Sequence, residues 1–430
     1  MKQNDMIIPL LIMIISLQSK DEDYSGGPMF IARQPIFNNE LEVYGYELLF
    51  RLNSNSTQFG GISSQGATAM VITGLFESGL DSLIEDKIAF INFDEIFIHS
   101  NALELIKPER MIVEMLENIE VSSHLVDRLT DIKKNGYSIA LDDFAQTYQT
   151  YPLTPLADII KYDIMVTPLD TIVSDIATGI AQGKILLAEK VETLEEFLKA
   201  KEMGFKLFQG YFFSKPSIAG RSFNTSPSQI QYLRLMAEIN KDEPSFDLLA
   251  DLIEQDVTLS YRLLRLASFR AGSELISSIK FALSYIGLRE FERWISILMI
   301  HDLGKDKPKE LIKISLIRTR FAESLAKRAK MLSLEHESAV MGLFSTLDAI
   351  MDQPMSEVLS EVSLPQSILD ALIHGEGILF PIYELMISYE QGNWPVVEAI
   401  SETLNIEDYS IYHAYREAIK WANDVILNIT

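Results

Sequence analysis

Polar side chains in the first half of the sequence have the types and spacing of a metal-dependent hydrolytic site. Each lies inside or at the end of a short apolar run, and the set comprises Glu47, Asn92, Glu114, Asp142 with Asp143, Lys161, Glu189 and Gln209. From Asn92 to Gln209 the successive separations are 22, 28, 19, 28 and 20 residues, about one strand–helix unit each. Isolated charges inside strands are costly, so the series indicates either one shared site or a row of rim salt bridges, and we expect the shared site.

The chemistry of this set is dominated by oxygen. Carboxylate and amide oxygens without His or Cys favour Mg²⁺ or Mn²⁺ over zinc. The adjacent Asp142 and Asp143 could serve two neighbouring ions, the arrangement that clamps both oxygens of a phosphodiester during in-line displacement. Lys161 could orient a water or offset charge, and Arg51 could hold a phosphate.

The elements that must position these groups are short strands alternating with helices. Strand-length apolar runs between residues 30 and 216 read FIARQPIF, VYGYELLF, IAFINF, MIVEML, YSIALDDF, IIKYDI, KILLAEKV and FKLFQGYFF. Helix-like segments, such as Val121 to Asn135 and Leu194 to Met203, lie between several of them. This alternation predicts a mostly parallel sheet, and a (β/α) barrel would bring the strand ends together at its C-terminal mouth.

Eight ordered motifs resemble the EAL domain, the cyclic-di-GMP phosphodiesterase module of bacterial signalling. They are RQPIF (33–37), YELLFR (46–51), INFD (91–94), VEMLE (113–117), LDDFA (141–145), IKYD (160–163), AEKVET (188–193) and QGYFFSKP (209–216). The resemblance implies a TIM-like barrel that opens cyclic-di-GMP to pGpG with Mg²⁺ or Mn²⁺. The region is shorter than a full barrel of ~250 residues, so we expect trimmed helices.

The resemblance also implies a role for each site residue. Glu47, Asn92, Glu114 and Asp142 would be metal ligands, and Asp143 would serve a second ion. Lys161 and Glu189 would position or deprotonate the attacking water. Gln34, Arg51 and Gln209 would contact the dinucleotide, and Glu117 and Glu192 would support the ligands.

Four departures from the EAL motifs stand close to the implied site. Leu48 replaces an Ala, Ala145 and Lys190 each replace a Gly, and the loop after LDDFA reads QTYQTY (146–151). They motivate a rival hypothesis, a catalytically silent adaptor that binds cyclic-di-GMP or a protein partner and regulates motility or biofilm formation.

The second half predicts an all-helical domain. Apolar spacing predicts helices that include Glu335 to Met351, and the stretches QDVTLSYRLLRLAS (255–268) and ISSIKFALSYIGLREF (276–291) resemble an HDOD domain. That family is a helical output or interaction module, so the resemblance implies a protein partner. We place a disordered extension at 1–28, the EAL-like barrel at 29–222 and the HDOD-like domain at 223–430.

A third hypothesis is an HD-type phosphohydrolase site at His301 and Asp302. HDLGK (301–305) is similar to the HDIGK motif of HD-GYP phosphodiesterases, whose adjacent His-Asp pair shares a metal. The upstream His and the GYP tripeptide are missing, and we interpret HDLGKDKP as a charged loop after an apolar helix. His336 and His374 would be the distant partners.

Charge and composition restrict the classes of partner and the location that we expect for this chain. With 37 Lys and Arg against 61 Asp and Glu, the net charge of −24 disfavours nucleic acid and anionic lipid. The apolar run Met6 to Leu17 is shorter than the ~20 residues that cross a bilayer, so an extension is favoured over a signal peptide or anchor. Cysteine is absent, which fits a cytoplasmic protein. The EAL resemblance is also compatible with a homodimer.

Overall fold

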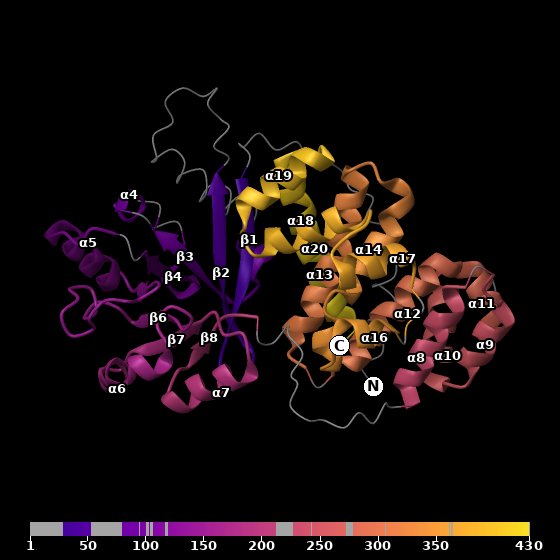
Figure 1. Ribbon diagram of the computed structural model, residues 1–430, viewed down its shortest axis with the longest axis horizontal. Helices are drawn as coiled ribbons and strands as arrows, with labels where there is room; N and C mark the ends of the chain where they lie inside the picture. Colours follow the sequence, from indigo (N-terminus) through magenta and orange to yellow (C-terminus); the bar gives the residue numbers. More distant parts are fainter. Residues whose placement is uncertain are drawn as a thin grey trace.

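The computed structural model describes most of the chain (Figure 1). The described residues are 29–52, 80–93, 95–99, 103, 106–116, 119–211, 227–241, 243–271, 278–305, 307–360, 362 and 364–429. The predicted extension at 1–28 and the predicted boundary after residue 222 lie outside them.

The first part of the described chain is a closed barrel with the strand order β1 to β8. The strands are β1 (Met29–Phe37), β2 (Val43–Leu52), β3 (Ile88–Phe93), β4 (Met111–Met115), β5 (Ser138–Leu141), β6 (Ile159–Asp163), β7 (Ile185–Glu189) and β8 (Leu207–Phe208). Neighbouring strands from β2 to β8 are parallel. Only β1 runs antiparallel to both its neighbours, because residues 38–42 turn the chain directly from β1 into β2. The predicted barrel is therefore confirmed.

The helices that the structure describes around the barrel are short. They are α3 (Leu80–Ile84), α4 (Glu95–Ile98), α5 (Ser123–Lys134), α6 (Val173–Ala181) and α7 (Leu194–Met203). Capping residues explain two of the helix starts, since Ser122 accepts from the backbone N–H of Leu125 and Thr193 forms a capping box with Glu196. Residues 142–158 connect β5 to β6 without a helix, which confirms that the barrel is shortened.

The barrel interior has an apolar floor. It is formed by Ile36, Phe90, Ile112, Ala140, Ile159, Leu187 and Leu207. Side chains two residues apart in a strand share a face, so the next interior position toward the mouth belongs to the polar set of the sequence. Phe90 precedes Asn92 in this way, and Ile112 precedes Glu114. Strand pleating thus gathers the polar groups in one layer above the floor.

The rest of the described chain is helical. The helices are α8 (Pro227–Ile239), α9 (Phe246–Glu254), α10 (Val257–Ala271), α11 (Ile279–Ile286), α12 (Leu288–Leu303), α13 (Lys309–Arg328), α14 (Glu335–Phe344), α15 (Leu347–Met351), α16 (Met355–Ser360), α17 (Gln366–Leu369), α18 (Phe380–Glu390), α19 (Trp394–Leu404) and α20 (Asp408–Ile429). The predicted all-helical second part is confirmed. No helix among the described residues combines the length and the apolar character that a membrane span requires.

Two local predictions in this part were wrong. The single helix expected from Glu335 to Met351 is broken at Ser345 and Thr346, which bond through their hydroxyls to the Gly342 carbonyl and to Ser315 of α13. Such side chains compete with the helical backbone. The charged loop expected at HDLGKDKP begins later, because residues 301–303 form the last turn of α12.

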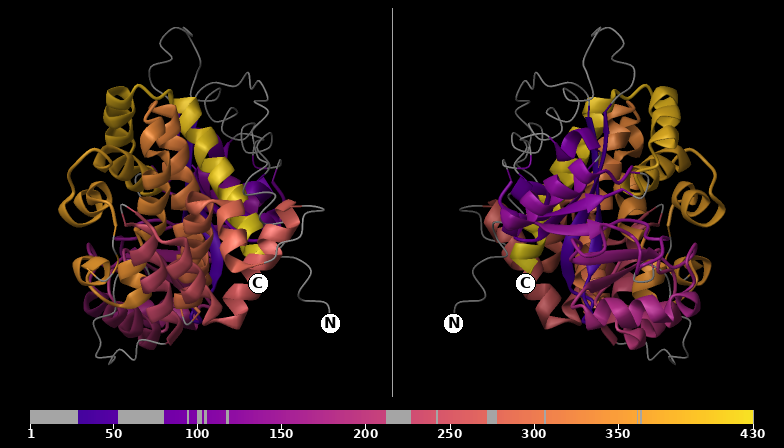
Figure 2. Two further views of the ribbon diagram at one scale, coloured as in Figure 1. Left: turned by 90° about the vertical axis from the view of Figure 1, so that its right-hand side faces the viewer. Right: turned by 90° about the vertical axis from the view of Figure 1, so that its left-hand side faces the viewer.

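The two parts of the molecule pack against each other along β1. Helices α18 and α20 lie beside β1 (Figure 1). Helix α20 also contacts α3. In the side views of Figure 2 the long helix α20 runs beside the first strands, while the region from α8 to α11 lies away from the barrel in Figure 1. The ring of Phe30 stacks on Trp394 at 5.3 Å between centroids.

Candidate active site

Four carboxylates converge on Lys161 in the barrel interior. Its Nζ atom lies 2.6 Å from Asp142, 2.8 Å from Glu114, 2.9 Å from Glu189 and 3.5 Å from Glu47. Lys161 and Glu114 have no exposed side-chain surface. The shared site expected from the sequence is therefore formed, and the alternative of separate rim salt bridges is wrong for these residues.

Glu47 is bound from two further strands. Asn92 of β3 donates its Nδ2 to Glu47 Oε1 at 3.0 Å, and Gln209, directly after β8, donates its Nε2 to Glu47 Oε2 at 2.7 Å. The same Gln209 nitrogen lies 3.2 Å from the side-chain oxygen of Gln34 in β1. Gln34 faces Glu47 across the β1–β2 pairing. One connected group of side chains thus joins Gln34 to Lys161.

Gly45 makes this arrangement sterically feasible. It is the interior residue below Glu47, and a Cβ atom there would lie 2.6 Å from the Ile88 carbonyl oxygen and 3.0 Å from the Phe90 ring. The missing side chain lets Phe90 fill the floor beneath the acidic layer.

Burial and charge shift the pKa values of the cluster in different directions. Burial raises the pKa of Glu114 well above its usual range, raises that of Asp142, and raises the pKa of Glu189 to about 8. Burial would also raise the pKa of Glu47, but Lys161 and the amides of Gln209 and Asn92 outweigh it and lower the pKa. For Lys161, burial opposes the charge, yet the surrounding carboxylates raise its pKa well above the ordinary value.

The remaining predicted site residues lie at the edge of the cluster or outside the described part. Asp143 follows Asp142 with φ at 41°, and its charge acts on Asp142 and on Lys190. Glu192 lies just before α7, where its backbone N–H donates to Glu196 at 2.8 Å. Arg51 belongs to β2, but only its backbone is described, and Glu117 lies outside the described residues.

Lys190 occupies an unusual backbone position beside the cluster. Its φ of 54° lies in the left-handed region, which explains why the resembling motif has Gly there. Its Nζ atom lies 2.5 Å from Asp163 Oδ2, and Asp143 and Glu189 add to the negative field around it. Lys190 therefore brings a cation close to the acidic cluster.

The donor chemistry of the cluster fits a hard divalent cation. Buried oxygens that accept no hydrogen bond within the described residues include Asn92 Oδ1, Glu114 Oε2 and Glu189 Oε2. Four carboxylates also face a single ammonium group, so the cluster holds excess negative charge when ionised. Across the described ranges, no three His, Asp or Glu side chains are already spaced around an ion. The carboxylates point at Lys161 instead, so a bound cation would have to take over contacts of its ammonium group.

Sequence reasoning missed the residues that connect the site to the helices. Arg33 faces outward from β1, with its Cζ 4.2 Å from the centre of the Tyr46 ring and its Nη2 3.9 Å from Glu310 of α13. Arg318 of α13 pairs with Glu390 of α18. No local pattern marks these residues, because each partner lies far away in the chain.

The His-Asp pair of the third hypothesis has structural partners. Asp302 accepts a hydrogen bond from the Tyr232 hydroxyl and lies 2.9 Å from Lys305. Burial opposes ionisation of Asp302, but bonds from His301, Tyr232 and Lys305 outweigh it and lower the pKa. His336, named as a distant partner, pairs with Glu292 at 2.6 Å instead.

Comparison with known proteins matches both parts of the chain. The EAL domain model matches residues 92–216, and the HDOD domain model matches residues 227–363. The uncharacterized protein YuxH of Bacillus subtilis (strain 168) is 34% identical over 413 residues, which are 93% of this chain and 99% of that protein. Cyclic di-GMP phosphodiesterase CdgJ of Vibrio cholerae serotype O1 is 31% identical over 401 residues, 92% of this chain and 93% of CdgJ.

Among solved structures, a manganese and cyclic-di-GMP complex of Klebsiella pneumoniae BlrP1 is 21% identical and covers 45% of this chain and 57% of that one, with a TM-score of 0.36. The two full-length relatives, together with the ordered EAL and HDOD matches, decide the family. The chain belongs to the family of proteins in which an EAL domain is followed by an HDOD domain.

Proposed function

We propose that this protein hydrolyses cyclic-di-GMP to linear pGpG at the acidic layer of its EAL barrel, with Mg²⁺ or Mn²⁺. The observation that carries the proposal is the convergence of Glu47, Glu114, Asp142 and Glu189 on one buried layer with Lys161. The full-length relative CdgJ, which bears the name of a cyclic di-GMP phosphodiesterase, supports the choice of substrate.

In this proposal the cation would be held by Glu47, Asn92, Glu114 and Asp142, with Asp143 serving a second one. A bound cation would neutralise the phosphodiester and make a coordinated water more acidic. Lys161 would balance the remaining negative charge, since its ammonium group touches all four carboxylates. Gln34, Arg51 and Gln209 would contact the dinucleotide.

The proposed reaction consumes one water. In its ionised form Glu189, which lies 2.9 Å from Lys161, would accept a proton as the water oxygen attacks phosphorus. The bond from phosphorus to the 3′ oxygen breaks, and that oxygen leaves as a hydroxyl group after taking up a proton. The product keeps its second phosphodiester and carries a new 5′ phosphate.

The test is turnover by the purified full-length chain. Cyclic-di-GMP is incubated in Mg²⁺ and then in Mn²⁺, and pGpG is followed by chromatography. We expect product that disappears when EDTA is added. Glu47→Gln should reduce turnover at least 100-fold, because it removes one negative charge from the buried cluster, whereas Glu42→Gln, at an exposed position just before β2, should leave it unchanged. Absence of pGpG in both metals would overturn the proposal.

A second candidate function is a catalytically silent adaptor that binds cyclic-di-GMP. The observation that favours it is the position of Lys161, whose ammonium group occupies the point on which the carboxylates converge. An adaptor would bind cyclic-di-GMP in a titration without producing pGpG. In cells, Glu47→Ala would then leave motility and biofilm formation unchanged, whereas loss of hydrolysis would alter both.

The proposal extends to the arrangement of the whole chain. It places the EAL barrel at 29–222 and the HDOD domain at 223–430, and it keeps the expectations of a cytoplasmic location, a homodimer and a protein partner for the HDOD domain. The HDOD model match at 227–363 supports the assignment of the helical part.

A further inference from the structure

The barrel is incompletely paired where it meets the helices. Within the described residues, strand β1 pairs with β8 at Phe37 and Phe208 alone, so the described part of β8 does not pair with the rest of that edge of β1. Helix α18 takes this place at Ile31, because the Tyr389 hydroxyl accepts from the Ile31 N–H at 3.3 Å and donates to the Ile31 carbonyl at 3.0 Å. The helical part therefore supplies hydrogen-bond partners to this edge of the barrel at Ile31.

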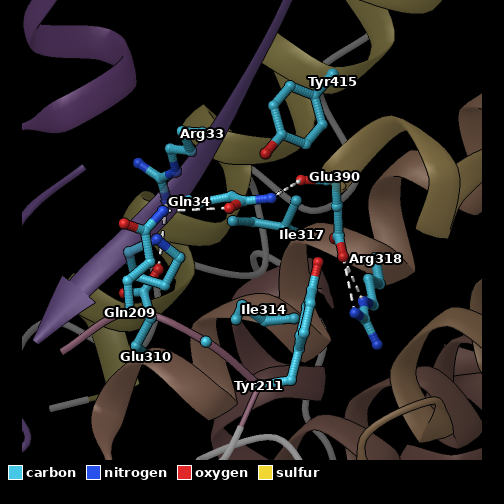
Figure 3. Close-up of a pocket in the computed structure, with 12 residues that line it drawn as sticks. Arg33, Gln34, Gln209, Tyr211, Glu310, Ile314, Ile317, Arg318, Glu390 and Tyr415 are labelled. Atoms are coloured by element: carbon cyan, nitrogen blue, oxygen red, sulfur yellow. Dashed lines mark hydrogen bonds and ion pairs between the residues drawn. The ribbon is translucent and has the colours of Figure 1, made fainter. Parts of the chain in front are cut away.

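A pocket at this junction is lined by two amide side chains that connect to the acidic layer (Figure 3). Gln34 and Gln209 line it from the barrel, and Arg318 and Glu390 line it from the helices. The Gln34 Nε2 donates to the backbone carbonyl of Glu390 at 3.4 Å, while its Oε1 accepts from Gln209 at 3.2 Å. Since Gln209 also donates to Glu47, a continuous series of contacts runs from α18 to the acidic layer.

The end of α18 is itself held by a buried ion pair. Arg318 donates through Nε and Nη2 to one carboxylate oxygen of Glu390, at 2.9 and 2.7 Å, and through Nη1 to the Ser345 hydroxyl at 3.1 Å. Burial opposes the charge of Arg318, but Glu390 outweighs this effect and raises the pKa of Arg318. Charge-assisted bonds in such a dry place restrict the position of the Glu390 backbone.

Further contacts join the turn that follows α18 to the barrel mouth. Tyr211 shares a hydrogen bond with Gln391, and burial together with the Glu390 charge raises the pKa of Tyr211 to about 12. Gly392 lies against Leu49, the second residue after Glu47, so closely that a Cβ would come within 2.7 Å of Leu49 Cδ1. The turn after α18 therefore contacts the barrel at two places, at Tyr211 after β8 and at Leu49 of β2.

We propose that the Arg318–Glu390 ion pair positions Gln34 for the dinucleotide, so that the helical part sets the affinity of the barrel for its substrate. Arg318 and Glu390 are positioning residues, because they reach the site only through the Glu390 carbonyl and the Gln34 side chain. The inference rests on the proposed function, since it assigns Gln34 a contact with cyclic-di-GMP.

The kinetic test compares Arg318→Ala with the full-length wild type. We expect KM for cyclic-di-GMP to rise about tenfold while kcat stays within twofold, because the acidic layer is untouched and only substrate positioning is lost. Arg318→Lys keeps the charge but not the paired donors, and it should restore part of the affinity. Arg320→Ala is the matched control, because Arg320 lies on the same helix and pairs locally with Glu323 at 2.7 Å.

Two further measurements separate this inference from a folding defect and from the proposed function. The double variant Arg318→Ala, Glu390→Gln leaves no uncompensated buried charge, and it should show the same rise in KM with a native circular dichroism spectrum. Calorimetric titration with cyclic-di-GMP in Ca²⁺ measures affinity without relying on turnover, so loss of catalysis in the wild type would count only against the proposed function. Unchanged KM and unchanged affinity in the double variant would overturn the inference.

Discussion

Lys161 decides the electrostatics of the candidate site. A fully buried ammonium group is stable only when its desolvation is offset, and here four carboxylates provide the compensation. The relation is mutual, because without Lys161 the same carboxylates would be buried together without a cation. The cluster is therefore held by the attraction of one ammonium group for several carboxylates rather than by any single strong pair.

Replacing Lys161 by Met, which has a similar length, tests this balance. We expect the free energy of unfolding in metal-free buffer to fall by about 3–5 kcal/mol, measured by urea denaturation. Added Mn²⁺ should raise the stability of Lys161→Met more than that of the wild type, because a cation then takes the vacated position.

Lys199→Met is the control for this comparison. Lys199 pairs with Asp170 at 2.6 Å, but both side chains are largely exposed, so the loss should stay below about 1 kcal/mol. Equal losses in the two variants would contradict a special role for Lys161.

Among the elements, the turn between α18 and α19 packs directly against the barrel at Leu49. Gly392 has φ at 68°, where an L-residue is strained, and it also leaves no room for a side chain against Leu49. Gly183, after α6, has a similar φ of 75°, but a Cβ atom there would meet nothing within 4 Å. The two glycines thus differ in their surroundings and not in backbone conformation.

Substituting each of these glycines by Ala separates strain from contact. Both variants should lose about 1 kcal/mol from the left-handed conformation, and Gly392→Ala should lose roughly 1–3 kcal/mol more because Leu49 must move. Urea denaturation of the two proteins measures the difference. Equal losses would mean that the turn can move away from the barrel without cost.

At the scale of the whole molecule, the barrel and the helices share one continuous core. Phe30 of β1 stacks on Trp394, and Tyr389 packs against both rings while bonding to the Ile31 backbone. Arg33 and Tyr46 on the outer face of the barrel meet Glu310 of α13. Because these contacts are buried, separating the two parts would expose apolar surface and leave charges unpaired.

We therefore predict that the protein unfolds in one transition. All three Trp residues (294, 394 and 421) belong to the helical part, so their fluorescence reports on that part and on the contact of Trp394 with Phe30 of β1, whereas far-ultraviolet circular dichroism reports on both parts. The two urea curves should coincide. Tyr389→Phe should lower the urea midpoints of both curves together. The free energy of unfolding should fall by about 1–3 kcal/mol, because the variant leaves the Ile31 backbone groups without the Tyr389 hydroxyl as a partner.

Tyr285→Phe serves as the control, because Tyr285 lies on α11 and is 40% exposed. It should leave both curves in place. Two separate midpoints in the wild type would contradict a shared core.

The sequence by itself determined the barrel and the membership of its acidic layer. Apolar alternation locates each strand, and the period of two places Asn92, Glu114 and Lys161 on the same face as the apolar floor residue before each of them. These are local properties, so the chain encodes them within a few residues. The recurrence of polar residues such as Glu47, Asp142 and Glu189 in or at the end of one strand after another was sufficient to expect one shared site.

Only the tertiary structure decided how the site is completed. The short contact of β1 with β8 and the packing of α18 against Ile31 depend on partners more than 150 residues apart. The Arg318–Glu390 pair and the contact of Glu390 with Gln34 follow from the packing of α13 and α18 against that open edge. Such contacts leave no periodic pattern in the sequence, because they are fixed by the meeting of two separately encoded surfaces.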